Sequence, residues 1–179
     1  MGNSDKALDA IVVGAGFAGI YMLHRLRQQG LNAKVIEAGT GVGGTWYWNR
    51  YPGARCDIPS MQYSYQFSEE LQQEWEWSEK YATQGEILKY AEHVVDRFGL
   101  KDGIQFNTKV ASAKYLEDSE MWQLTLSSGE TLEARFVVMA TGCLSKPNYP
   151  NIEGLNECRV PVYHTGAWPH EGVDFTGLN

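Results

Sequence analysis

A glycine-rich turn near the N-terminus constrains this chain more than any other stretch. Gly14, Gly16 and Gly19 follow the apolar run Ala10–Val13, a helix-like segment comes next, and a second apolar run ends on Glu37. Strand, glycine turn, helix, strand and acidic residue is the order of a dinucleotide-binding βαβ unit. The sequence therefore predicts an α/β fold that is organised around this unit, with a nucleotide at the turn.

Each residue of the turn has its own physical task. Gly14 permits the tight turn out of the strand, Gly16 lets the backbone approach a pyrophosphate, and Gly19 lets the helix pack closely on the strand. The pyrophosphate would lie on the unpaired N–H groups at the helix start, where the macrodipole favours negative charge. Glu37 is placed to accept hydrogen bonds from ribose hydroxyls and would repel a 2′-phosphate. The alternative is a plain βαβ turn, because glycine also marks ordinary turns.

The net charge and the cysteine content exclude several classes of partner. With a net charge of −7 and a pI near 5.1, the chain has no basic field that would attract nucleic acid or an anionic membrane surface. No apolar run approaches the length of a membrane span. Cys56, Cys143 and Cys158 lack CxxC spacing, which indicates unpaired thiols in a reducing compartment and no metal site. Because the first residues also lack an apolar signal region, we expect a cytoplasmic protein.

The middle of the chain predicts a small helical insertion. Glu69–Tyr81 has a helical pattern with two tryptophans near its end. Thr83 followed by Glu86 is a capping-box pattern that opens another helix, and Gly99 is placed to stop it. In the helix after the glycine turn, His24 falls among outward polar positions, so we expect its side chain to be solvated.

Beyond the insertion the sequence period changes from helical to alternating, which predicts a β-meander. Phe136–Ala140 is a continuous apolar run, as expected of a strand buried in a parallel sheet. It ends at Thr141 and Gly142, where backbone can approach a ligand at the carboxyl end of a strand, although a simple strand-to-loop turn is the alternative. The short antiparallel strands expected before it are Ile104–Thr108, Val110–Leu116, Trp122–Leu126 and Thr131–Arg135.

Two long segments lack regular patterning. Residues 38–60 form a glycine- and aromatic-rich connection, and a loop of this length inside a compact domain is usually functional. The alternative is a packed Ω-loop whose aromatic side chains form a core of their own. Beyond Leu144, prolines and glycines predict an extended linker with a dense cluster at residues 163–170. We therefore divide the chain into a domain at residues 1–145 and a linker at residues 146–179.

Four motifs in this order resemble a known family. They are the glycine turn with Glu37, GGTWYWNRYPGARCD at Gly43–Asp57, ATG at Ala140–Gly142, and HTGAWP at His164–Pro169. Together they resemble the N-terminal third of a type I Baeyer–Villiger monooxygenase, with the closest likeness to members that act on aryl-substituted or bulky cyclic ketones. Such enzymes are FAD- and NADPH-dependent flavoproteins that insert oxygen beside a ketone carbonyl. The resemblance implies a Rossmann-like FAD-binding βαβ unit with a small helical insertion and an antiparallel β-meander, in an incomplete sheet.

The resemblance also implies roles for individual residues. Asp57 matches the family's acidic residue beside the flavin and the nicotinamide, where a carboxylate could orient an arginine. The alternative is a loop Asp that caps a nearby turn. His164 and Trp168 would couple the cofactor domains, although Cys158 and Val160 stand where the family has an aromatic residue and a glycine. A buried histidine that hydrogen-bonds to backbone is the alternative for His164.

The resemblance implies that FAD would be bound along the whole length of the domain. The implied FAD-binding residues are Gly14, Gly16, Phe17 and Gly19 at the pyrophosphate, Glu37 at the ribose, Val110 at the adenine, Gly44, Thr45, Trp46 and Tyr63 along the flavin, Arg55, Cys56 and Asp57 beside it, and Ala140, Thr141 and Gly142 at the second strand end.

Three hypotheses of function follow from the resemblance. Family members are several times longer than 179 residues, and their NADPH site and catalytic arginine have no counterpart in the sequence. The first hypothesis is a truncated or split monooxygenase that acts on a small ketone once a complementary fragment is supplied. The second is a compact FAD module that acts as a flavin reductase or oxidase, or is an engineered minimal domain. The third is a remnant without cofactor. An open sheet edge would also favour self-association.

Overall fold

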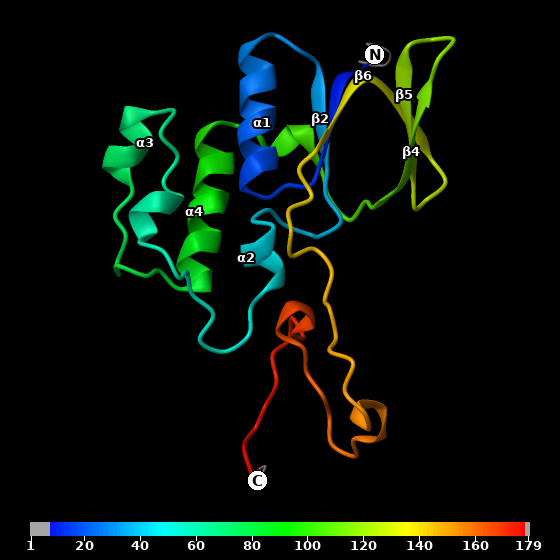
Figure 1. The fold of residues 1–179 in the computed structure, drawn as a ribbon. Helices are drawn as coiled ribbons and strands as arrows, with labels where there is room; N and C mark the ends of the chain where they lie inside the picture. The colour runs from blue at the N-terminus through cyan, green and yellow to red at the C-terminus, as the bar shows by residue number, and fades with distance from the viewer. Residues whose placement is uncertain (1–7, 178–179) are drawn as a thin grey trace.

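A central parallel strand, β1 (Leu8–Val13), organises the computed structural model, which describes residues 8–177. It pairs in parallel with β2 on one side and with β6 on the other, and β2 pairs in parallel with β3. The β4–β5 hairpin continues the sheet beyond β6 in antiparallel orientation, which gives the order β3-β2-β1-β6-β5-β4 (Figure 1). The predicted Rossmann-like α/β fold is confirmed. The other strands are β2 (Ala33–Ile36), β3 (Ile104–Gln105), β4 (Val110–Leu116), β5 (Met121–Leu126) and β6 (Thr131–Met139).

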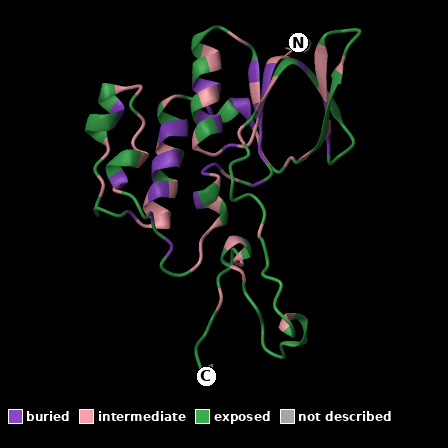
Figure 2. Cartoon of the chain, in the orientation of Figure 1, coloured by how far each residue is buried: buried purple, intermediate pink, exposed green. Residues whose placement is uncertain are grey.

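Helices α1 and α4 lie on one side of the sheet, with α3 beyond α4 (Figure 1). Because side chains alternate along a strand, Val12 of β1 faces these helices and Ile11 faces the β4–β5 hairpin. Both are fully buried, and buried residues concentrate along α1, α4 and the parallel strands (Figure 2). The helices are α1 (Phe17–Gln28), α2 (Thr45–Trp48), α3 (Glu69–Glu74) and α4 (Gln84–Arg97), with short 3₁₀ turns at Ser60–Tyr63, Lys101–Gly103, Leu155–Glu157 and Thr165–Ala167.

The start and the end of α4 follow the predicted signals. The Thr83 hydroxyl accepts a hydrogen bond from the Glu86 N–H at 3.4 Å, and Gly99 has a φ of +59° just beyond the last turn. The other half of the capping box differs, because the Glu86 carboxylate accepts from the N–H and hydroxyl of Ser78 at 2.7 and 2.8 Å. The carboxylate therefore ties the preceding segment to the helix.

The helix predicted over Glu69–Tyr81 is wrong beyond Glu74. Trp75 has an extended backbone, with φ of −102° and ψ of 118°, and its ring and that of Trp77 each lie 5.1 Å from the ring of Tyr90. The Trp77 indole N–H also donates to the Ser64 hydroxyl at 2.9 Å. Burial of two large aromatic rings against α4 outweighs the helical propensity of the segment.

Two strand predictions are also wrong. The strand at Ile104–Gln105 is parallel to β2 and not part of the antiparallel meander. The runs predicted as two strands, Thr131–Arg135 and Phe136–Ala140, form the single strand β6. Residues 131–134 pair with β5, Ala134 also pairs with β1, and residues 135–139 pair only with β1 among the described residues. Phe136 and Met139 are accordingly 57% and 62% exposed, so this half of the strand is not buried on both faces.

His24 is buried and not solvated, with only 8% of its surface exposed. Its ring stacks on Phe67 at 4.5 Å and meets the edge of Phe98 at 4.8 Å. Burial disfavours the imidazolium and lowers the pKa of His24, and the positive charge of Arg25 lowers it further. The prediction failed because the two rings that cover His24 come from segments distant in sequence.

Residues 141–177 form an arm without α-helix or β-strand that leads away from the sheet (Figure 1). It contains two 3₁₀ turns, and most of its residues are exposed (Figure 2). Val160 is not among the residues with positive φ, so the chain passes this position without the backbone conformation that glycine favours. The division at residue 145 stays a prediction.

Acidification is expected to destabilise the fold through His24. Because the folded state binds fewer protons there than the unfolded chain, the free energy of unfolding should fall as the pH drops through about 6.5. The fall should cease once the pH lies below the folded-state pKa. In His24→Phe, which keeps an aromatic ring between Phe67 and Phe98, urea unfolding at pH 7.5 and 5.5 should show a smaller loss than in the wild type. An equal loss in both proteins would assign the effect to other groups.

The approach of the 38–60 loop to the glycine turn gives a prediction with a matched control. Gly44 has a φ of +55°, and a Cβ there would lie 2.8 Å from Gly16 Cα. Gly53 has a φ of +78°, with nothing within 4 Å of such an atom. Both alanine variants should lose about 1–2 kcal/mol to the left-handed backbone. Only Gly44→Ala should lose about 1–3 kcal/mol more to the clash, as measured by urea unfolding. Equal losses of stability in the two variants would mean that the 38–60 loop moves away from the glycine turn at little cost.

Candidate functional site

The glycine turn joins the carboxyl ends of three strands. The Gly14 N–H donates to the carbonyl of Ile36 at 2.8 Å, and the Ala140 N–H donates to the carbonyl of Val13 at 2.9 Å. A Cβ at Gly14 would lie 2.6 Å from the Ala140 carbonyl oxygen, and a Cβ at Gly19 would lie 1.8 Å from the Gly14 carbonyl oxygen. Glycine at both positions therefore permits the close contact of turn, helix and β6.

The N-terminus of α1 is suited to an anion. Gly16 is its N-cap, no side chain caps the helix, and its first turn contains no acidic residue. The first backbone N–H groups thus lack a side-chain acceptor while the helix dipole adds a partial positive charge. These features fit a dinucleotide pyrophosphate.

The Glu37 carboxylate lies at the centre of the turn and is 5% exposed. One oxygen accepts from the Ala15 N–H at 2.6 Å and the other from the Gly39 N–H at 2.7 Å. This double role within the protein was not foreseen from the sequence. A carboxylate offers about four lone pairs, so it keeps acceptor capacity for ribose hydroxyls.

An aromatic wall extends from the start of α1. The Phe17 ring lies 5.6 Å from Tyr63 and 5.5 Å from Tyr65, and Trp46 meets Tyr63 at 5.5 Å. The Tyr65 hydroxyl donates to the Phe17 carbonyl at 2.5 Å. Burial raises the pKa of Tyr63, and the nearby Cys56 and Asp57 raise it further. The structure therefore brings Phe17, Trp46 and Tyr63 together with the loop that carries Asp57.

The three residues predicted beside the flavin point in different directions. Cys56 is buried in a cluster with Trp46, whereas Asp57 is exposed. The Arg55 guanidinium points to the segment before α4, where it donates to the Glu79 carboxylate at 2.9 Å and to the Tyr81 carbonyl at 3.1 Å. Of the three side chains, Asp57 is therefore the one open to a ligand.

The remaining predicted positions surround the turn. Gly44 faces Gly16, and Thr45 is exposed at the start of α2. Thr141 and Gly142 follow β6 directly and are exposed. Val110 begins β4, two residues after Thr108, whose N–H donates to the Glu37 carbonyl at 2.9 Å. The chain thus enters β4 next to Glu37.

His164 and Trp168 lie in the arm and contact other arm residues. The His164 ring accepts from the Gly166 N–H at 3.0 Å and lies tilted against Tyr149 at 4.7 Å, and Trp168 contacts Tyr163 and Phe175. His170, which sequence reasoning did not single out as a site residue, instead reaches the 38–60 loop. Its ring lies 5.3 Å from Tyr47 and 5.5 Å from Trp48. The sequence signal that could have identified His170 was its position two residues after Trp168, in the same cluster at residues 163–170.

Residues 8–177 contain no group of three or more His, Cys, Asp or Glu side chains that could hold a metal ion. No helix there is both long and apolar enough to cross a bilayer. The prediction that the first residues lack an apolar signal region concerns mainly residues 1–7, which lie outside the described range.

Comparison with known proteins identifies the family. Residues 11–175 match the family described as pyridine nucleotide-disulphide oxidoreductase. A phenazine N-monooxygenase of Lysobacter antibioticus is 48% identical over 168 residues, which cover 93% of this chain and 31% of that protein. A Baeyer–Villiger monooxygenase of Pseudooceanicola batsensis is 45% identical, over 94% of this chain and 31% of that protein.

Solved structures agree with this assignment. An oxidised steroid monooxygenase bound to NADP has a TM-score of 0.87 and 55% identity, over 97% of this chain and 33% of that one. OTEMO in complex with FAD and NADP has a TM-score of 0.87 and 42% identity, over 96% and 34%. The resemblance in the sequence is thereby confirmed. The chain belongs to the pyridine nucleotide-disulphide oxidoreductase family, is similar to the N-terminal part of Baeyer–Villiger-type monooxygenases, and spans about a third of the length of the relatives it matches.

Proposed function

We propose that residues 8–177 form the FAD-binding part of a Baeyer–Villiger-type monooxygenase. The observation that carries the proposal is the α1 N-terminus, which lacks a side-chain cap at the point where the glycine turn and the Glu37 carboxylate meet. Backbone N–H groups of α1 would hold the pyrophosphate, and Glu37 would accept from the ribose hydroxyls. Phe17, Trp46 and Tyr63 would line the path to the flavin.

Bound FAD would supply redox chemistry, with NADPH as the hydride source and O2 as the co-substrate in the oxidation of a small ketone to an ester or lactone. Asp57 is the proposed catalytic residue of this chain, since its exposed carboxylate could orient a cationic side chain beside the flavin. His164 and Trp168 are proposed to couple the cofactor domains through the arm. Activity of this kind belongs to the whole protein and needs its NADPH-binding part.

A second candidate function is a compact flavin module without monooxygenation. The turn, Glu37 and the aromatic wall all lie within residues 8–177, which supports flavin binding by this part of the chain. The free edge of β6 at residues 135–139 supports self-association or pairing with a complementary fragment.

Exposed thiols at Cys143 and Cys158 support a reducing, cytoplasmic location.

The visible spectrum of the purified chain, followed by anaerobic NADPH, tests the proposal. We expect a yellow protein that releases FAD on unfolding and stays oxidised with NADPH, because the second nucleotide site belongs to the whole protein. Bleaching by NADPH would instead support the compact oxidoreductase. A colourless chain that does not quench the fluorescence of added FAD would refute FAD binding and favour the remnant.

Glu37→Gln tests the turn directly. An amide places an N–H donor against one of the N–H groups of Ala15 and Gly39, which leaves a buried donor unsatisfied. The free energy of unfolding should fall by about 1–3 kcal/mol, and FAD should bind more weakly. The control Glu117→Gln, at an exposed position on the β4–β5 hairpin, should change neither quantity. Wild-type stability and FAD affinity in Glu37→Gln would remove Glu37 from the site.

A further inference from the structure

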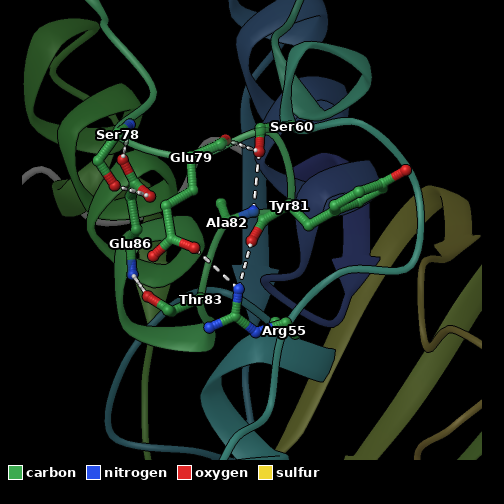
Figure 3. A network of polar contacts seen from close by, with 8 residues as sticks. All are labelled: Arg55, Ser60, Ser78, Glu79, Tyr81, Ala82, Thr83 and Glu86. Atoms are coloured by element: carbon green, nitrogen blue, oxygen red, sulfur yellow. Dashed lines mark hydrogen bonds and ion pairs between the residues drawn. The ribbon is translucent and has the colours of Figure 1, made fainter.

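The loop that carries Asp57 is fastened at both ends to the segment that precedes α4 (Figure 3). Before Asp57, the Cys56 N–H donates to the Ala82 carbonyl at 3.1 Å, and the Ala54 carbonyl accepts from the Gln84 N–H at 2.8 Å. After Asp57, the Ser60 N–H donates to the Lys80 carbonyl at 2.8 Å. Residues 57–59, which we call the Asp57 arch, therefore span two fixed points.

The Ser60 hydroxyl makes the tightest attachment. It donates to the Glu79 carbonyl at 2.7 Å and accepts from the Ala82 N–H at 2.8 Å (Figure 3). Ser60 is 2% exposed, so water cannot replace either bond. A hydroxyl supplies both a donor and an acceptor, which alanine cannot. The far end of the arch is therefore held by this hydroxyl together with the Ser60 N–H, and the hydroxyl is its only side-chain attachment among the described residues.

The attachment through Arg55 is weaker. Its ion pair with Glu79 at 2.9 Å has side chains that are 47% and 49% exposed. Exposed ion pairs contribute little to stability, because water screens the charges and the side chains lose freedom when they pair. The backbone bonds of Ala54 and Cys56 keep that end in place without it, so Ser60 and not Arg55 is the critical side chain.

The arch itself has little freedom once its ends are fixed. Pro59 restricts the backbone next to Ser60, with a φ of −55°. Within residues 8–177, no hydrogen bond holds the Asp57 carboxylate, which leaves its position to the backbone of the arch. We propose that Ser60 is a positioning residue for Asp57, and that its buried hydroxyl keeps the carboxylate beside the flavin. The inference deepens the proposed function and rests on it.

Amide hydrogen exchange tests the attachment without any cofactor. In Ser60→Ala, exchange at the amides of Cys56 and Ser60, the two within residues 56–60 that donate to the segment before α4, should become faster by about tenfold or more, because a buried bridge between two backbone groups is lost. Ser60→Thr keeps the hydroxyl and should exchange like the wild type. Ser78→Ala removes a hydroxyl from the same network away from the arch and should leave these amides unchanged. Unchanged exchange in Ser60→Ala would overturn the proposal.

If Ser60→Ala does not fold, Ser60→Cys replaces it, because a thiol keeps the volume and forms much weaker hydrogen bonds. Faster exchange at residues 56–60 would again support the attachment. Wild-type exchange in Ser60→Cys would overturn it.

A double-mutant cycle on the FAD-loaded chain tests the link to Asp57. Asp57→Asn should shift the absorption spectrum of bound flavin, because a charge beside the ring is lost. Ser60→Ala should give part of the same shift, Ser60→Thr none, and Ser60→Ala should add nothing in the Asp57→Asn background. A full additive shift, or no shift in Asp57→Asn, would overturn the positioning role.

The two tests separate the two proposals. A chain that exchanges as expected but binds no FAD refutes the proposed function and, with it, the positioning of Asp57 beside a flavin. A chain that binds FAD but shows no change in Ser60→Ala refutes only the role of Ser60.

Discussion

The buried Glu37 carboxylate connects the parts of this domain that a nucleotide site requires. Its two oxygens accept from the glycine turn at Ala15 and from the start of the long loop at Gly39. The backbone of Glu37 itself bonds to Gln105 and Thr108. One residue thus links the ends of β1, β2 and β3. The contact is charge-assisted and shielded from water, which makes it stronger than a hydrogen bond between neutral groups.

The second constraint is the close approach of two glycine segments. Gly44 can lie against Gly16 because it has no side chain, since a Cβ at Gly44 would lie 2.8 Å from Gly16 Cα, and this contact places Trp46 of α2 beside the start of α1. The loop at residues 38–60 then continues to Asp57, where backbone bonds to the segment before α4 fix its course. Exposure of Asp57 within such a well-attached loop is more consistent with a functional than with a purely packed Ω-loop.

Local sequence signals predicted the βαβ unit, the β-hairpin and the start of α4, because each depends on residues close in sequence. They failed where distant segments decide. His24 is covered by the rings of Phe67 and Phe98, which are distant in sequence. The segment with Trp75 and Trp77 is not helical, and both of its rings pack on Tyr90. Likewise, no local signal showed that β6 continues through the boundary at residue 135. The predicted site residues came from motifs and stay predictions, whereas the internal bonds of Glu37 needed the structure.

The pairing of β1 with β6 has a consequence for how the domain folds. Leu8 lies opposite Ala134 and Val13 opposite Met139, so the central ladder joins segments separated by most of the chain. Such non-local pairing raises the contact order and slows folding. During synthesis the N-terminal βαβ unit emerges first, with one edge of β1 unpaired until β6 leaves the ribosome. A chaperone that shields strand edges would therefore find this second edge of β1 open only in the nascent chain.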